Sequence, residues 1–220
     1  MIDPISQICE SKSSNFSDFQ LAFLSHIHEL LFLGYQKLDA KALSTSDEPS
    51  ITGELVRGIR AVMDDPDSAD WVVQFNVEDD PPVNDGKSVG KRRPRVDIGF
   101  SSNERKPRDH LVFEAKRLGP SHPIAGYLNR DGLGCFLAGQ YAAKDGDAGM
   151  LGYVQSSPLE DWADKLGKKL KGSSKKYAVC SGYGWKKHSF KGGPGHTFHT
   201  RHRRDDGRQI EIYHSLLRFC

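Results

Sequence analysis

Apolar residues recur at helical spacing in two N-terminal segments. This spacing predicts an amphipathic helix over 17–39 and a second helix over 51–63. Gly53 and Gly58 weaken the second prediction, because glycine is a poor helix former. The periodic positions are Leu21, Leu24, Ile27, Leu31, Leu38, Ile51, Leu55, Ile59 and Val62.

Short runs rich in β-branched and aromatic residues predict strands further along the chain. The runs 95–100 and 110–118 are joined by polar residues, which favours an antiparallel pair. A terminal hairpin is predicted around residues 205–207. The remaining expected strands are 71–77, 148–155 and 176–182, and the remaining expected helices are 127–144 and 157–172.

This mixture of helices and strands predicts an α/β protein. No internal repeat or clean linker divides the chain, so one domain over 1–220 is expected. Its core is expected at about 51–155, preceded by the helix over 17–39 and followed by a basic C-terminal extension over 157–220.

The net charge of +2 hides a strong asymmetry between the two parts of the chain. Residues 1–85 carry 5 basic and 16 acidic side chains, a net charge of −11. Residues 86–220 carry 26 basic and 13 acidic side chains, a net charge of +13. The basic part favours a polyanionic partner.

Composition excludes several classes of protein. No apolar run approaches the roughly 20 residues that a membrane-spanning helix needs, and no secretory signal is visible. The four cysteines lack a C-x-x-C pair, and Cys135 is expected to be a small buried residue. We therefore expect a soluble, cytoplasmic protein without a membrane partner.

Charged residues interrupt two of the apolar strands. Asp97 lies in the run 95–100, and Glu114 and Lys116 lie in the run 110–118. Side chains alternate faces along a strand, so Glu114 and Lys116 point the same way, and a neighbouring strand can place Asp97 beside them. Two carboxylates and an ammonium group suit a hard divalent cation and phosphodiester chemistry.

An Asp in one strand followed by Glu-x-Lys at the end of the next resembles the PD-(D/E)XK nuclease superfamily. The resemblance implies a restriction-endonuclease-like fold with a central mixed β-sheet flanked by helices. It also implies Mg²⁺, with Mn²⁺ as a substitute, bound by Asp97 and Glu114, and an attacking water positioned by Lys116. Val96 stands where the family often has proline.

Two further roles follow from the resemblance. Many members add a glutamate from an upstream helix, and Glu54 is the candidate for completing the metal shell or orienting a water. A Gln or Tyr on the helix after Glu-x-Lys often supports the site, which points to Gln140 or Tyr141. The resemblance covers about 51–155.

Lysines and arginines interleaved with aromatic residues predict a nucleic-acid surface. The glycine-containing loop 184–195 is the preferred contact in the C-terminal part, whereas the lysines of 165–171 are equally compatible with a solvated helix face. Lys87 and the cations after it immediately precede Asp97 and can steer a phosphodiester. The predicted nucleic-acid-binding residues are Lys91, Arg92, Arg93, Arg95, Gln140, Lys186, Lys187, Lys191 and Arg201.

Histidines gather near the C-terminus, but their spacing does not favour a zinc site. His199 and His202 are three residues apart on an expected strand and would point to opposite faces. No paired cysteines accompany them.

The sequence thus predicts a metal-dependent deoxyribonuclease that hydrolyses phosphodiester bonds in DNA, with RNA open as a substrate. The roles of other proteins with this fold suggest restriction or anti-phage defence. The alternatives are a non-catalytic nucleic-acid-binding module of the same fold and a regulatory subunit whose acidic N-terminal part binds a basic partner. Self-association as a homodimer and a separate partner subunit both stay open.

Overall fold

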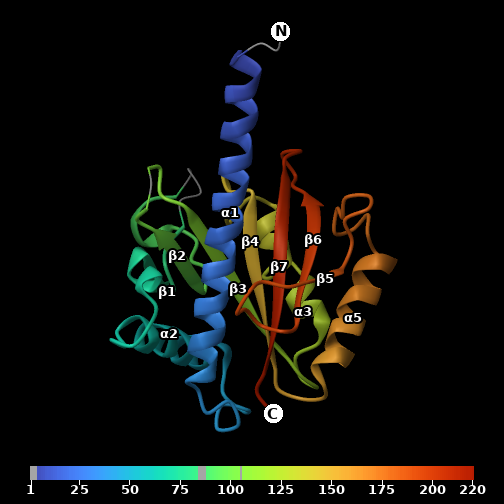
Figure 1. Ribbon diagram of the computed structural model, residues 1–220. Coiled ribbons are helices and arrows are strands. Elements are labelled where there is room, and N and C mark those ends of the chain that lie inside the picture. The colour runs from blue at the N-terminus through green and yellow to red at the C-terminus, as the bar shows by residue number, and fades with distance from the viewer. Residues whose placement is uncertain (1–3, 84–87, 105) are drawn as a thin grey trace.

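The computed structural model describes residues 4–83, 88–104 and 106–220, with their side chains from residue 18 onward. The chain forms an α/β structure built on a seven-stranded mixed sheet flanked by helices (Figure 1). The helices are α1 (Pro4–Gln36), α2 (Glu48–Met63), the short 3₁₀ turns η1 (Asp70–Gln74) and η2 (Gly90–Arg92), α3 (Ile124–Leu128), α4 (Leu133–Leu137) and α5 (Leu159–Gly172). The strands are β1 (Phe75–Asp79), β2 (Ile98–Ser102), β3 (His110–Leu118), β4 (Asp147–Val154), β5 (Lys186–His188), β6 (Thr197–Arg203) and β7 (Gln209–Arg218).

The strands lie in the order β1-β2-β3-β4-β7-β6-β5. β1, β2 and β3 form an antiparallel meander, and β3, β4 and β7 are mutually parallel. β7, β6 and β5 are antiparallel again. The segment 157–220, expected as an extension of the core, therefore supplies three strands of the sheet, and β7 lies between β4 and β6.

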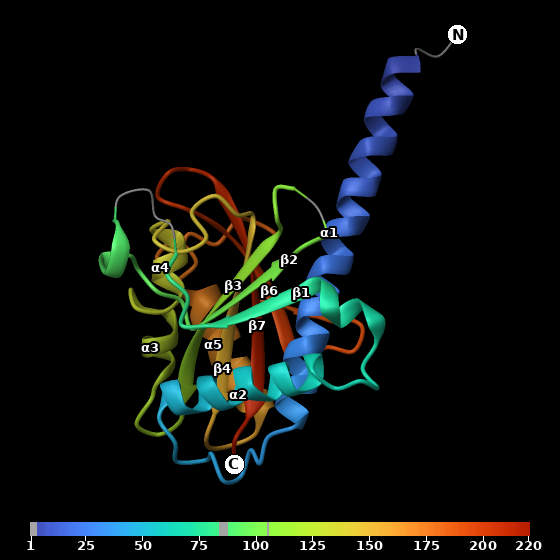
Figure 2. The same cartoon turned by 90° about the vertical axis from the view of Figure 1, so that its left-hand side faces the viewer.

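Two hydrophobic layers cover the two faces of the sheet. One layer packs α1 and α2 against β1, β2 and β3. The other packs α3, α4 and α5 against the opposite face. Figure 2 shows α1 on one side of the sheet and α3 and α4 on the other, with the N-terminal half of α1 projecting beyond the body. Among the described helices, none combines the length and hydropathy required of a bilayer-spanning segment.

Most predicted elements are confirmed within a few residues. The antiparallel pair expected from 95–100 and 110–118 is β2 and β3, with Ile98 opposite Phe113. The terminal hairpin is β6 and β7. α1 begins well before residue 17, and α2 begins at Glu48 because Asp47 caps it by accepting a hydrogen bond from the Ser50 N–H.

Four predictions of secondary structure are wrong in part or whole. The strand expected over 71–77 begins only at Phe75; before it, η1 turns so that Trp71 stacks on His26 of α1 and leaves Val73 exposed. The helix expected over 127–144 is split into α3 and α4 by the turn at Gly132, where a Cβ would lie 2.3 Å from the Tyr127 carbonyl oxygen.

The strand expected over 176–182 is absent from the described structure of that segment. Ala178 and Gly182 adopt positive φ angles of 48° and 79°, which break an extended chain. Only an isolated bridge joins Val179 to His202 of β6. In the loop expected over 184–195, residues 186–188 form the short edge strand β5.

Candidate active site

Two neighbouring strands bring the predicted charged residues together. Ile98 of β2 lies opposite Phe113 of β3, so Asp97, which immediately precedes β2, is level with Glu114. Asp97 Oδ2 accepts a hydrogen bond from the Ala115 N–H at 2.6 Å, which fixes its carboxylate against β3. Asp97 and Glu114 therefore converge as the sequence predicts.

Lys116 completes the cluster from two residues further along β3. Its Nζ donates to Glu114 Oε1 at 2.7 Å and to Glu48 Oε1 at 2.9 Å. The side chain of Glu114 is 7% exposed, and those of Lys116 and Glu48 are 18% and 23% exposed. The ammonium group thus lies between two carboxylates at a partly buried position, where ion pairing is screened less than at the surface.

Glu48 is a member of the site that the sequence analysis missed. It is the first residue of α2, and its Oε2 accepts a hydrogen bond from the Arg117 N–H at 3.0 Å. Asp47, a helix-capping residue, and Pro49, which favours the first turn of a helix, together signal that a helix begins near Glu48. Because the apolar periodicity begins only at Ile51, the helix predicted over 51–63 leaves Glu48 outside it.

Glu54 lies elsewhere on α2. It pairs with Arg57, one turn along the same helix, and among the described residues it has no interaction with Asp97, Glu114 or Lys116. Six residues separate it from Glu48, which places the two side chains on different faces of the helix. The structure therefore brings Glu48, and not Glu54, to the cluster.

Burial and like charge shift the acidity of the two strand carboxyls. Burial, followed by the charge of Asp97, raises the pKa of Glu114 to about 8, against the opposing effect of Lys116. Burial also raises the pKa of Asp97. Burial opposes the charge on Lys116, but the carboxylates of Glu114 and Glu48 raise its pKa above the ordinary value. Lys116 is therefore a fixed cation at neutral pH.

Tyr141 and Cys135 border the site from the α4 side. Burial, followed by the charge of Glu114, raises the pKa of the Tyr141 hydroxyl and raises that of the Cys135 thiol to about 11. Cys135 is buried, as predicted, and its Sγ donates to the Arg130 carbonyl oxygen. Of the two candidates after Glu-x-Lys, Tyr141 is the one near Glu114, whereas the Gln140 side chain is exposed.

The donor atoms of the site are carboxylate oxygens, the type that binds a hard divalent cation. Glu114 and Glu48 pair with the single ammonium group of Lys116, and Asp97 lies beside Glu114, so three carboxyl groups share one cation. Oxygen ligands of this type suit Mg²⁺. The raised pKa values of Asp97 and Glu114 have the same origin, because burial penalises charges without enough neutralising partners. Within the described residues, no group of three or more His, Cys, Asp or Glu side chains is already arranged as a metal-binding set.

The predicted nucleic-acid-binding cations do not form one surface. Lys91 and Arg92 are exposed on η2, and Arg93 Nε donates to the Gly90 carbonyl oxygen. Arg95 Nε pairs with Asp80 at 2.6 Å. These residues precede Asp97 at the β2 side of the sheet. Lys87 lies outside the described residues.

The second group of cations lies at the opposite edge of the sheet. Lys186 and Lys187 are exposed on β5, and Lys191 is exposed in the loop that follows. Arg201 pairs with Glu211 and lies over the Tyr183 ring at 3.6 Å, so its charge is already partly balanced. Three strands, β4, β7 and β6, separate this edge from β3 in the order of the sheet.

The C-terminal histidines form hydrogen-bonded pairs. Thr200 Oγ1 lies 2.7 Å from His202 Nε2 and 2.8 Å from His214 Nε2, and the other ring nitrogen of His214 lies 3.0 Å from the Tyr127 hydroxyl. His199 pairs with Glu211. These contacts satisfy the buried imidazoles inside the protein.

Comparison of the chain with protein-family models, with curated proteins and with solved structures finds no match in any of the three. What the site does is therefore inferred from its own geometry and charge.

Proposed function

We propose that the chain is a metal-dependent endonuclease of restriction-endonuclease-like fold that hydrolyses phosphodiester bonds in DNA. The observation that carries this proposal is the convergence of Asp97, Glu114 and Lys116 from two neighbouring strands. Partly buried charged groups with shifted pKa values are costly to the fold and are typical of functional sites. The mixed sheet flanked by helices is the architecture that the resemblance implies.

Asp97 and Glu114 would hold the cation, and Glu48 offers a third carboxylate on the same side. When bound, Mg²⁺ or Mn²⁺ supplies positive charge against the negative charge that develops on the phosphodiester. The Ala115 N–H keeps the Asp97 carboxylate oriented, and the Arg117 N–H does the same for Glu48. The chain thus provides preoriented oxygen ligands.

Lys116 keeps its proton throughout, because neighbouring carboxylates raise its pKa. It acts as a fixed cation that attracts the phosphate and orients a nearby water by donating hydrogen bonds from Nζ. It is not a proton acceptor at neutral pH. The exposed Lys91 and Arg92 raise the local concentration of a polyanion near Asp97.

Plasmid cleavage tests the proposal. The wild type is expected to nick or cut supercoiled DNA in Mg²⁺ or Mn²⁺, and Lys116→Met is expected to reduce the rate at least about 100-fold, the usual effect of removing a charge-stabilising group. Lys41→Met, an exposed lysine in the loop after α1, is the matched control and should keep the wild-type rate. Circular dichroism checks that each variant is folded.

Equal rates for wild type and Lys116→Met would refute the catalytic assignment. So would the absence of cleavage by the folded wild type in both metals. DNA binding without cleavage would instead support the non-catalytic module.

A further inference from the structure

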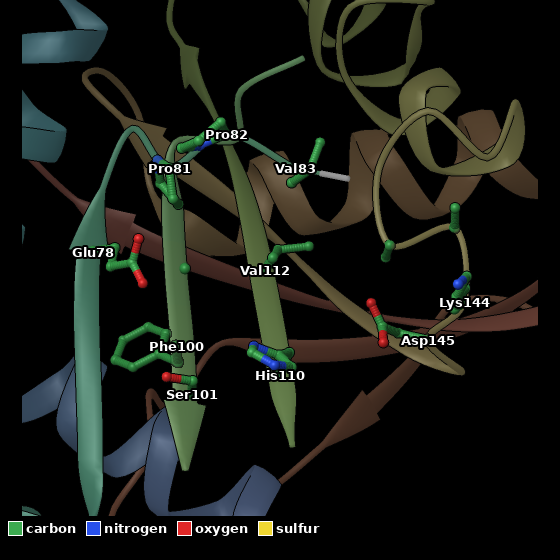
Figure 3. Close-up of a pocket in the computed structure, with 13 residues that line it drawn as sticks. Glu78, Pro81, Pro82, Val83, Phe100, Ser101, His110, Val112, Lys144 and Asp145 are labelled. Atoms are coloured by element: carbon green, nitrogen blue, oxygen red, sulfur yellow. The ribbon is translucent and has the colours of Figure 1, made fainter. Parts of the chain in front are cut away.

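A cavity of about 330 Å³ opens on the same face of the sheet as the candidate active site. Figure 3 shows it between β2 and β3 on one side and the loop after α4 on the other. The residues that matter below are Gly99, Ser101, Val112, Ala143 and Asp145.

The cavity lies beside the candidate active site along β2 and β3, although Asp97, Glu114 and Lys116 do not line it. Val112 precedes Glu114 by two residues on β3, so both side chains point to one face, about 7 Å apart along the strand. Gly99 follows Asp97 by two residues, and the loop 142–145 begins immediately after Tyr141. A phosphodiester placed at Glu114 and Lys116 therefore has an adjoining nucleotide within reach of the cavity.

Most of the residues that line the cavity are apolar, and the loop on its far side is held in place. Pro81 packs on β2 so closely that a Cβ at Gly99 would lie 2.8 Å from its ring. Ala142 and Ala143 form the opposite wall. The buried guanidinium of Arg204 fixes that loop by donating to the carbonyl oxygens of Ala142, Ala143 and Asp145, at 2.6–2.9 Å.

Asp145 is one of five polar or charged residues that line the cavity, with Glu78, Ser101, His110 and Lys144. Its carboxylate points toward Val112 and His110 in Figure 3. No hydrogen bond from the described residues reaches this carboxylate, and burial raises its pKa against the opposing charges of His110 and Arg204. A half-buried carboxylate without a donor is expected to accept hydrogen bonds from a ligand, and the Ser101 hydroxyl and Glu78 add further polar atoms to the cavity.

We propose that this cavity binds a guanine base of the DNA strand, next to the phosphodiester that is cleaved. The apolar walls accommodate a flat ring, and the two carboxylate oxygens of Asp145 match the two adjacent donors of guanine, N1–H and the N2 amino group. Thymine presents one N–H between two carbonyl oxygens and is disfavoured. The placement beside the cleaved bond rests on the proposed nuclease function, but the affinity for guanine does not.

Nuclear magnetic resonance titration tests the cavity without relying on cleavage. Deoxyguanosine is expected to shift the amide resonances of Gly99 and Lys144, and to bind at least about tenfold more tightly than deoxyinosine, which lacks the N2 amino group, or thymidine. Asp145→Asn should remove this difference, and Ala143→Trp should abolish binding by filling the cavity.

Ala138→Trp, an exposed position outside the cavity, is the control and should bind normally. Equal binding of deoxyguanosine and thymidine, or normal binding by both cavity variants, would overturn the proposal.

Sequencing the ends of fragments cut from a random DNA library provides the second test. The wild type should enrich guanine beside the cut, and the fragments that Asp145→Asn produces should lack that enrichment. Fragments without any guanine preference would overturn the cavity proposal and leave the nuclease function standing, and this holds even if free deoxyguanosine binds. No fragments from any variant would refute the nuclease function, while the titration would still decide whether the cavity binds guanine.

Discussion

Lys116 sets the charge balance of the candidate active site. Its ammonium group is shared between Glu114 and Glu48, which come from a strand and from the first turn of a helix. Without it, three carboxylates would face one another in a partly buried position, and repulsion among them would raise their pKa values further. The same residue therefore links the geometry of the site to the acidity of its carboxyl groups.

Glu48 and Glu54 provide a matched test within one helix. Glu48→Gln removes a negative charge beside Lys116, so we expect plasmid cleavage in Mg²⁺ to fall at least about tenfold, as for residues that support metal ligands. Glu54→Gln should change the rate by less than about twofold, because Glu54 pairs with Arg57 instead. Gel assays of supercoiled plasmid measure both rates. A larger loss in the Glu54 variant would contradict the placement of Glu48 in the site.

Part of this site is visible in the sequence, because charged residues stand out in apolar strands. Asp97, Glu114 and Lys116 have that signature, and their alternation along the strands predicts a shared face. Glu48 has no such signature. It lies in a polar segment, where Asp47 and Pro49 signal the start of a helix but not its neighbours. Its ion pair with Lys116 joins residues 68 positions apart, so only the packing of α2 against the sheet brings it to the site.

At the scale of elements, the contact between α1 and α2 depends on two glycines. A Cβ at Gly58 would lie 2.4 Å from the carbonyl oxygen of Gly34, and a Cβ at Gly34 would lie 2.3 Å from a side-chain carbon of Ile59. The backbones thus approach too closely for any side chain. α2 forms despite its glycines because one of them permits the contact that buries the apolar face of the helix.

Alanine substitutions at the two glycines of α2 should have opposite effects on the free energy of unfolding. Gly58→Ala is expected to lower the free energy of unfolding by about 2 kcal/mol, since the clash with Gly34 outweighs the gain in helix propensity. Gly53→Ala should raise it by up to about 1 kcal/mol, because the nearest atom to its Cβ is 4.0 Å away. Urea denaturation measures both values. Stabilisation by both substitutions would show that the helices do not cross at Gly58.

The pattern of apolar and polar residues predicts an element correctly when the bounds of that element depend on its own residues. β3 is found with its exact bounds, because its apolar run lies between a polar turn and the strand-breaking pair Gly119 and Pro120. The strand expected over 71–77 begins late because Trp71 packs against His26 of α1, a contact that the local pattern does not contain. The position of β7 inside the sheet likewise depends on pairing with β4, which is distant in sequence.

At the scale of the whole molecule, both layers beside the sheet contain buried histidines. His28 of α1 stacks on Phe190, with Nδ1 2.8 Å from the Leu24 carbonyl oxygen, and its Nε2 has no partner among the described residues. His202 lies on the other side, between Thr200 and the Tyr177 carbonyl oxygen. Burial lowers the pKa of each imidazole to about 4.

These histidines should make the fold sensitive to acid. A histidine in the unfolded chain takes up a proton below pH 6.5, whereas the folded protein keeps His28 neutral down to about pH 4, so stability is lost in that interval. The nearby His188 adds to the effect by opposing a positive charge on His28. At pH 5 the loss amounts to about 2 kcal/mol for each histidine.

The raised pKa of Glu114 acts in the opposite direction, since its protonation favours the folded state as the pH falls through about 8. The measurement must therefore isolate one histidine. When the pH falls from 7 to 5, the free energy of unfolding of His28→Gln should decrease by about 2 kcal/mol less than that of the wild type. His110→Gln, at an exposed position, should reproduce the wild-type change. Urea denaturation at the two pH values decides the matter: identical changes in all three proteins would mean that His28 is protonated in the folded state or accessible to water.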